Sequence, residues 1–257
     1  MASPWNPDQY HQFRDERSKP FFDLLGLVEP LRGGVAIDLG CGTGELTKIL
    51  HERSGAAQTL GLDSSDTMLA KSAAQAGDGL SFAQGDITEF SGTFDLVFSN
   101  AALQWINGHE ELIPKIADHV QAGGQLAFQV PANADHPSHV VAHRIAREEP
   151  FATALQGYSR QWPVLAPERY AEILDGLGFG ELTIRLEVYG HHLESTDGVV
   201  EWVKGSLLTD YERRMPAELF QDYVARYRDQ LIRELGMHSP YFYAFKRILV
   251  RGRKGPR

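Results

Sequence analysis

Residues 38–44 read Asp38-Leu-Gly-Cys-Gly-Thr-Gly44, and this stretch decides the fold. It begins inside the short apolar run Val35–Leu39, as a buried parallel strand would. Leu46, Ile49 and Leu50 follow it at helical spacing. Glycine lets a backbone come close to a ligand where a Cβ would collide. The stretch therefore predicts a strand, a tight glycine loop and a helix, and it is a candidate ligand site.

The spacing of the glycines excludes two common phosphate loops. The dinucleotide fingerprint G-x-G-x-x-G would need its third glycine at Glu45, and a P-loop would need a lysine that this stretch lacks. A glycine-rich turn without a ligand remains the alternative. Asp63 and Asp86 favour a ligand, because each ends one of the next two expected strands. Asp63 there suits ribose hydroxyls and Asp86 an adenine amino group, although both residues are also common helix caps.

Outward from the loop, strands and helices alternate along the first half of the chain. Such alternation predicts an α/β fold with a parallel sheet and helices on both faces. Ser65 is the expected N-cap of the helix that carries Met68. Seven strands are expected, at 35–39, 59–63, 80–83, 93–99, 125–130, 183–193 and 241–250. We therefore predict a Rossmann-like, doubly wound, mostly parallel seven-stranded sheet.

The second half of the chain predicts a helical cap. The long connection between the last two strands contains helical patterns near 197–208 and 216–235, and residues 137–147 are also expected to be helical. No independent linker is visible. The organisation we predict is one domain over residues 1–257, with cap elements at approximately 136–170 and 195–238.

Charge and composition exclude several classes of protein. The 257 residues carry a net charge of −9, which repels nucleic acid and anionic lipid. No apolar stretch is long enough for a membrane span, and the N-terminus does not resemble a secretory signal. Cys41 is the single cysteine, so an internal disulfide is excluded. A cytosolic location is expected, and the sequence does not predict an oligomeric state.

The loop together with Asp63 and Asp86 resembles the class I methyltransferases, which use S-adenosylmethionine, over about residues 30–135. A narrower resemblance, to the trans-aconitate methyltransferases, covers nearly the whole chain. It implies the cofactor, methyl transfer and an acid substrate. The stretches that carry it are Trp5-Asn-Pro-Asp-Gln-Tyr10, Glu16-Arg-Ser-Lys-Pro20, Leu62-Asp-Ser-Ser65, Asn100-Ala-Ala-Leu-Gln-Trp105, Glu201-Trp-Val203 and Ala244-Phe-Lys-Arg247.

The resemblance also implies roles for individual residues. The three glycines face the methionine part of the cofactor, and Asp38 holds either the loop or the cofactor's amino group. Asp63 takes the ribose hydroxyls, and Asp86 with the Ile87 backbone addresses the adenine. An N-terminal segment folds over the cofactor, and the end of the fourth strand lies beside the methyl donor. The implied cofactor-binding residues are Tyr10, Arg17, Asp38, Gly40, Gly42, Gly44, Asp63, Ser64, Met68, Asp86, Ile87 and Asn100. Met68 is equally well explained as a core residue of its helix.

Methyl transfer to a carboxylate needs no general base, because a carboxylic acid is already ionised at pH 7. No base is evident in residues 100–105, so we predict that the protein acts by positioning and by excluding water. Arginine and histidine donors match a carboxylate. The substrate-binding residues predicted on this basis are Gln104, Trp105, His139, Arg144, Arg160 and Arg247.

Several alternatives remain open. His139 and His143 are four residues apart, but the glutamate of a zinc-protease motif is replaced by Val140, so no metal is expected. Within enzymes, the acid could be another small one, such as a malonyl thioester; the aromatic stretch 239–243 departs from the expected pattern. A nucleic-acid methyltransferase is disfavoured by the net charge and by the residues after Asn100. A cofactor-binding protein without catalysis is the last alternative.

Overall fold

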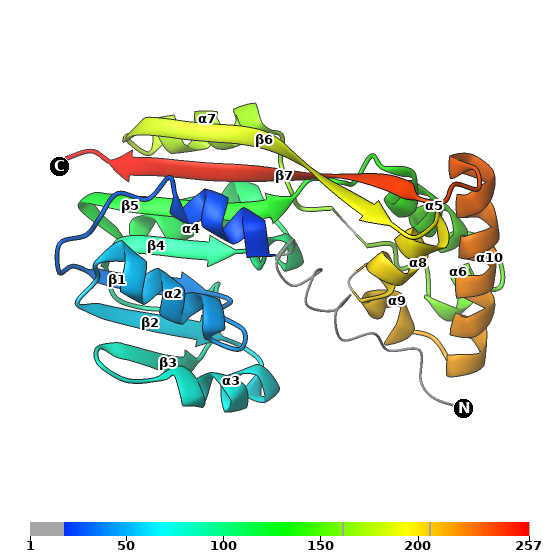
Figure 1. Ribbon diagram of the computed structural model, residues 1–257, viewed down its shortest axis with the longest axis horizontal. Coiled ribbons are helices and arrows are strands. Elements are labelled where there is room, and N and C mark those ends of the chain that lie inside the picture. The colour runs from blue at the N-terminus through cyan, green and yellow to red at the C-terminus, as the bar shows by residue number, and fades with distance from the viewer. Residues whose placement is uncertain (1–17, 161, 206, 257) are drawn as a thin grey trace. The chain divides into compact units, whose positions relative to one another are not determined.

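The computed structural model describes residues 18–160, 162–205 and 207–256. The chain divides into two compact units (Figure 1). The first contains the described residues up to Pro131, then Pro163–Glu187 and the chain from Arg247 onward. The second contains Ala132–Trp162 and Val188–Lys246. Each unit is described separately below.

One mixed sheet has the strand order β3-β2-β1-β4-β5-β7-β6 (Figure 1). β1 pairs in parallel with β2 and β4, β2 with β3, and β4 with β5, whereas β7 is antiparallel to β5. The predicted seven-stranded, mostly parallel and doubly wound fold is confirmed. The strands are β1 (Val35–Leu39), β2 (Gln58–Asp63), β3 (Leu80–Gln84), β4 (Phe94–Asn100), β5 (Val120–Pro131), β6 (Phe179–Leu193) and β7 (Tyr241–Lys254).

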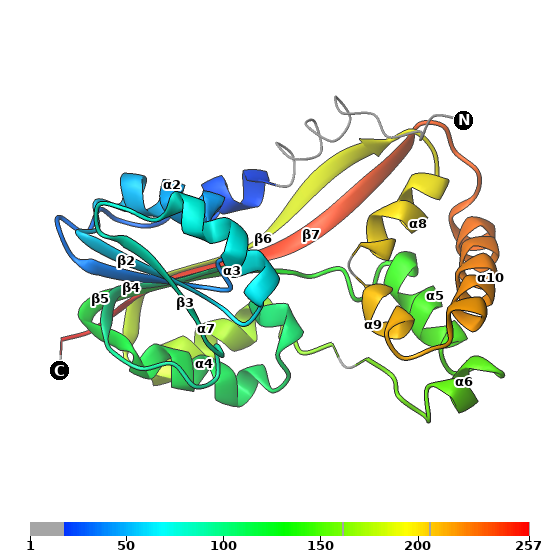
Figure 2. The ribbon, with the colours of Figure 1, turned by 90° about the horizontal axis from the view of Figure 1, so that it is seen from below.

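Helices cover both faces of the sheet in the first unit. α2 lies on one face, and α4 and α7 lie on the other (Figure 2). Ser65 caps α3 as expected, because its side chain accepts a hydrogen bond from the Met68 N–H. The elements are α2 (Glu45–Ser54), α3 (Asp66–Ser72), α4 (His109–Asp118), α7 (Pro167–Gly176), the 3₁₀ turns η1 (Ala73–Gln75) and η2 (Leu103–Trp105), and a helix over residues 18–25.

The core of the first unit lies between these layers. Ile37 and Phe98, on the two central strands, are fully buried, as expected for a parallel sheet covered on both faces. Tyr170 of α7 packs its ring 5.3 Å from Phe128, and its hydroxyl lies 2.5 Å from Nδ1 of His109. Residues 163–170, which the sequence analysis assigned to the cap, thus belong to the sheet unit.

The second unit is mostly helical. Its helices are α5 (Pro137–Ile145), α6 (Phe151–Ala154), α8 (Asp197–Lys204), α9 (Thr209–Glu212) and α10 (Ala217–Leu235). Two buried tyrosines of α10 join it to α5: Tyr223 donates to the Ala142 carbonyl at 2.7 Å and Tyr227 to the Ser138 carbonyl at 2.9 Å. Among the described residues of the whole chain, no helix is both long and apolar enough to cross a membrane.

Candidate active site

The glycine loop connects β1 to α2 in a left-handed backbone conformation. The φ angles of Gly40, Gly42 and Gly44 are 80°, 56° and 76°, which other residues rarely adopt. A Cβ on Gly40 would lie 2.2 Å from the Cβ of Ala102, and one on Gly44 would lie 2.6 Å from the Phe82 ring. A Cβ on Gly42 would meet no atom of the described residues within 4 Å. Packing therefore requires two of the glycines, and the third faces open space.

Asp63, at the end of β2, holds this loop. Its Oδ2 accepts a hydrogen bond from the Gly42 N–H at 2.8 Å, and its Oδ1 accepts one from the Ser65 N–H at 2.9 Å. An ionised carboxylate has about four acceptor positions, so the side chain can still accept ligand hydroxyls. Ser64, next in the chain, is exposed. Asp63 is thus both a structural tie for the loop and a free acceptor at the sheet edge.

Asp38 lies buried beneath the loop. The Thr47 hydroxyl of α2 donates to its Oδ2 at 2.6 Å. Burial raises the pKa of the Asp38 carboxyl to about 6, against the lowering effect of the Thr47 hydrogen bond, and the Asp63 charge raises it further. The Thr47 hydrogen bond connects the end of β1 to the first turn of α2.

The end of β3 lies beside the same loop. Asp86 is exposed, and its Oδ1 accepts hydrogen bonds from both the N–H and the hydroxyl of Thr88, each at 2.7 Å. Both hydrogen bonds lower the pKa of the Asp86 carboxyl, and the one from the Thr88 backbone N–H has the larger effect. The Ile87 side chain would lie 3.7 Å from a Cβ on Gly40. Met68 is 43% exposed, so the alternative that it is a core residue is wrong.

Asn100, at the end of β4, is the last residue in a series of side-chain hydrogen bonds that begins at Arg247 and passes through Gln129. Gln129 of β5 donates from Nε2 to Asn100 Oδ1 at 2.7 Å. Arg247 of β7 donates from Nη1 to Gln129 Oε1 at 3.1 Å. Three neighbouring strands therefore fix the orientation of the Asn100 amide at the carboxyl edge of the sheet.

The loop after Asn100 contains an unusual backbone and a buried acceptor. Ala101 has a φ of 55°, which is strained for a residue other than glycine. Gln104 is buried and donates from Nε2 to the Ala101 carbonyl at 2.6 Å. Its Oε1 is buried and has no hydrogen-bond partner among the described residues. Trp105 is half exposed. A buried acceptor of this kind is unfavourable unless a ligand or water donates to it.

In the second unit, His139, His143, Arg160 and Trp162 form a cluster. The His139 ring lies 5.2 Å from the Trp162 ring, and the Arg160 guanidinium lies 6.0 Å from that ring. Burial lowers the pKa of His139 to about 3, and the nearby His143 and Arg160 lower it further. Burial and the Arg160 charge also lower the pKa of His143, whose Nδ1 lies 2.8 Å from the Tyr211 hydroxyl. These neutral rings and one cation would favour an anion.

Arg144 lies in a different environment. Its guanidinium forms an ion pair with Glu234 at 2.6 Å and hydrogen bonds to Gln230, so it joins α5 to α10. This pairing already accounts for its charge without a substrate. Of the other predicted substrate residues, Gln104, Trp105 and Arg247 belong to the first unit and His139 and Arg160 to the second.

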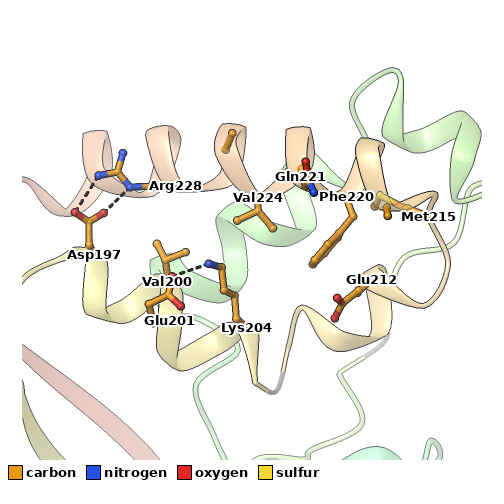
Figure 3. Close-up of a pocket in the computed structure, with 12 residues that line it drawn as sticks. Asp197, Val200, Glu201, Lys204, Glu212, Met215, Phe220, Gln221, Val224 and Arg228 are labelled. Atoms are coloured by element: carbon orange, nitrogen blue, oxygen red, sulfur yellow. Dashed lines mark hydrogen bonds and ion pairs between the residues drawn. The ribbon is translucent and has the colours of Figure 1, made fainter. Parts of the chain in front are cut away.

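A pocket of about 860 Å³ lies in the second unit between α8, α9 and α10 (Figure 3). Four of its charged residues form two ion pairs, Asp197 with Arg228 and Glu201 with Lys204, and Phe220 projects into it. It contains none of the predicted site residues. Within the described parts of the chain, no group of three or more metal-ligating side chains is found. Tyr10 and Arg17 lie outside the described residues.

Comparison with known proteins identifies the family. The family described as "Methyltransferase domain" matches residues 37–128. A trans-aconitate 2-methyltransferase of Deinococcus radiodurans is 46% identical over 95% of this chain and 96% of its own length. Another of that name, from Sinorhizobium fredii, is 37% identical over 89% and 90%. The chain belongs to the trans-aconitate 2-methyltransferase family. It is a family of S-adenosylmethionine-dependent methyltransferases, so the predicted family and cofactor are confirmed.

Solved structures support the fold. The YcgJ protein of Bacillus subtilis has a TM-score of 0.61 at 12% identity, over 92% of this chain and 98% of that chain. A phosphoethanolamine N-methyltransferase 2 of Haemonchus contortus in complex with S-adenosyl-L-methionine has a TM-score of 0.56 at 17% identity, over 93% of this chain and 53% of that chain. At these identities the likeness shows the fold alone.

The glycine loop fits the cofactor of the family. Among the described residues, Gly42 leaves an open face that a Cβ would fill, and α2 begins at Glu45 after an N-cap residue, Gly44, that provides no side-chain cap. Uncapped N–H groups at a helix N-terminus favour a carboxylate such as that of the cofactor's methionine part. Asp63 retains acceptor capacity for hydroxyls beside this face. The residues present therefore suit an adenosyl amino acid.

Three residues around the candidate site were not predicted from the sequence: Gln129, Thr47 and Ala101. Gln129 is the polar residue in the otherwise apolar run 126–130 of β5, and that exception is a signal that its side chain has a partner. Thr47 lies nine residues from Asp38 and has no local signature. The left-handed backbone of Ala101 has no signal in the sequence, because alanine rarely adopts it.

Proposed function

We propose that the chain transfers a methyl group from S-adenosylmethionine to a carboxylate oxygen of a small polycarboxylic acid, and that trans-aconitate is the acid. The product is a monomethyl ester. The observation that carries the proposal is the 46% identity, over nearly the full length of both chains, to a protein named trans-aconitate 2-methyltransferase.

In this proposal the cofactor lies along the carboxyl edge of β1, β2, β3 and β4. The glycine loop and the start of α2 receive its methionine part. Asp63 accepts the ribose hydroxyls, and Asp86 with Ile87 addresses the adenine. Met68 is exposed on α3, where its thioether can contact a ring. Tyr10 and Arg17 keep their predicted roles over the cofactor.

When bound, S-adenosylmethionine supplies an electrophilic methyl group on its sulfonium sulfur. A carboxylate oxygen of the acid forms the new bond to that carbon, and the carbon–sulfur bond breaks with its electron pair left on sulfur. The acid is ionised at neutral pH, so no residue needs to remove a proton. The protein aligns the acid and keeps water away, and alignment contributes up to roughly 7–11 kcal/mol to such reactions.

Binding a multiply charged acid requires donors that replace its water. Arg247 and Asn100 offer donors in the first unit, and Arg160 with the neutral His139 and His143 in the second. Gln104 is different, because its free group is an acceptor. It suits an N–H or O–H of the ligands rather than an ionised carboxylate.

The test is a transfer assay with cofactor carrying a labelled methyl group and a panel of small acids, including trans-aconitate, cis-aconitate, citrate and a malonyl thioester. We expect label in trans-aconitate that mild base releases as methanol, since methyl esters are base-labile. Label found only in the malonyl thioester would show that this acid, and not trans-aconitate, is the substrate. Label in amines or nucleic acid, with none in any acid, would contradict carboxylate transfer.

A further inference from the structure

Gln129 connects an arginine to the residue at the end of β4. It lies on β5 directly opposite Asn100 in the register of the two strands, and it is 1% exposed. Its Oε1 accepts from Arg247 at 3.1 Å, and its Nε2 donates to Asn100 Oδ1 at 2.7 Å. Its backbone carbonyl also accepts from the Ala101 N–H at 3.0 Å. Gln129 thus touches both the side chain and the loop at this position.

The arginine sets the direction of every hydrogen bond in this series. A guanidinium has only donors, so the amide oxygen of Gln129 must face Arg247 and its NH₂ must face Asn100. The oxygen of Asn100 then faces Gln129, and its own NH₂ group is turned away from it. An isolated asparagine amide would adopt either orientation. Here a buried glutamine and an arginine select one of them.

The NH₂ group that is turned away from Gln129 belongs to a residue at the edge of the sheet where ligands bind in this fold. β4 pairs with β1, and the Cβ of Ala102, two residues after Asn100, lies 2.2 Å from where a Cβ on Gly40 would lie. Ligands of open α/β sheets bind at this carboxyl edge. An NH₂ group presents two donors, which suit a carboxylate and repel a cation or an N–H donor.

We propose that Gln129 is a positioning residue that holds the Asn100 NH₂ group toward a carboxylate of the acid substrate. This inference rests on the proposed function, since it specifies how the acid is recognised. Neither Gln129 nor the direction of its hydrogen bonds follows from the glycine loop or from the cofactor.

The decisive variant is Gln129→Glu. A glutamate has acceptors only, so one oxygen still receives Arg247 while the other faces the oxygen of Asn100 and turns that amide over. The Asn100 oxygen then points outward and repels the acid. Loss of a charged hydrogen bond corresponds to roughly 10- to 100-fold. We expect KM for the acid to rise by that factor, and we expect the Kd of the cofactor, measured by calorimetry, to change by a much smaller factor.

Gln125→Glu is the matched control. Gln125 is a buried glutamine on the same strand, and its Oε1 also accepts from an arginine of β7, Arg251, but at the other end of the sheet. We expect KM for the acid to be unchanged in this variant. An equal rise in KM in both variants, or a change confined to the cofactor Kd in Gln129→Glu, would overturn the inference.

Two further measurements keep the inference testable if Gln129→Glu does not fold or if no acid is methylated. Asn100→Asp keeps the bond from Gln129 and turns an anionic oxygen outward, so it should raise KM for the acid by the same factor. In the ¹⁵N-labelled protein, adding an acid should shift the Asn100 side-chain amide resonance. A shift without methylation would refute the proposed function and retain the inference, whereas no shift on saturation would refute the inference.

Discussion

The carboxylate of Asp63 accepts a hydrogen bond from the backbone N–H of Gly42 at 2.8 Å, so the end of β2 holds the loop that follows β1. The two residues belong to neighbouring parallel strands and their loops, paired up to Leu39 and Leu62. One side chain therefore holds the glycine loop and is also the residue that we propose as the acceptor for the ribose. Mutations at this position will affect both.

Replacing Asp63 should weaken cofactor binding. In Asp63→Ala the loop loses its tie and the ribose loses its acceptor, and we expect a loss of about 1–3 kcal/mol in binding, roughly 5- to 150-fold in Kd. Asp63→Asn keeps one acceptor oxygen, so its Kd for the cofactor should lie between those of the wild type and Asp63→Ala. The measurement is calorimetric titration with the cofactor. Asp66→Ala, which removes an exposed acid on α3, is the control. An unchanged Kd in Asp63→Ala would exclude Asp63 from the site.

Two glycines of the same loop should respond differently to alanine. Gly40→Ala places a methyl group 2.2 Å from the Ala102 Cβ at a φ of 80°, so we expect a loss of roughly 2–4 kcal/mol in the free energy of unfolding. In the part of the chain that the structure describes, the new methyl group of Gly42→Ala meets no atom within 4 Å, so this variant should lose only about 1 kcal/mol. Its methyl group nevertheless enters the face that we assign to the cofactor, so affinity should fall.

Thermal melting and cofactor titration of these two variants separate folding from binding. The expected pattern is a large stability loss in Gly40→Ala and a large affinity loss in a folded Gly42→Ala. Normal cofactor affinity in Gly42→Ala would show that the open face of the loop is not the cofactor cradle.

Asp38 should make stability depend on pH. Burial raises its pKa from 3.8 to about 6, so the folded state holds a proton that the unfolded state releases at lower pH. Its stabilising contribution is complete below pH 3.8 and is lost as the pH rises to 6. Asp38→Asn should remove this dependence of stability on pH, because asparagine does not ionise. Its side-chain oxygen can still accept the hydrogen bond from Thr47. The difference in free energy of unfolding between variant and wild type should change by about 3 kcal/mol, at 1.36 kcal/mol per pKa unit.

Urea unfolding of both proteins in the absence of cofactor, at several pH values between 4 and 7, gives this difference directly. Other carboxylates titrate equally in the two proteins and cancel. A difference that stays constant across this range would mean that Asp38 has an ordinary pKa in the folded protein.

Arg160 and Arg144 should differ in their effect on the acid. Arg160 lies with His139 and Trp162, and Arg160→Ala should raise KM for the acid, with Arg160→Lys restoring part of it. Arg144 forms a partly exposed ion pair with Glu234, so Arg144→Ala should cost under about 1 kcal/mol of stability and leave KM unchanged. Steady-state kinetics with thermal melting as a check distinguishes them. The reverse pattern would transfer the substrate role to Arg144.

Much of the sheet unit was predictable because its signals are local. The apolar run at 35–39, the glycines after it and the cap at Ser65 lie within a few residues of what they determine. The ends of β5 and β6 were less predictable: β5 begins at Val120 rather than 125 and β6 at Phe179 rather than 183. Val120 pairs with Phe94 of β4, and β6 neighbours β7 in the sheet, so both strands depend on partners far along the chain, about which local sequence carries little information.

The sequence by itself determined the glycine loop and the acids at the strand ends, since the backbone freedom of glycine and the alternation of strands and helices follow from residue type and periodicity. Its resemblance to known proteins then indicated the family. Only the tertiary structure decided that Gln129 is hydrogen-bonded to both Asn100 and Arg247. It also decided that Arg144 pairs with Glu234 and that residues 163–170 belong to the sheet unit. The two hydrogen-bond partners of the Gln129 side chain lie 29 and 118 positions away from it along the chain. A hydrogen bond depends on distance and direction in space, and neither is encoded in the spacing of residues along the chain.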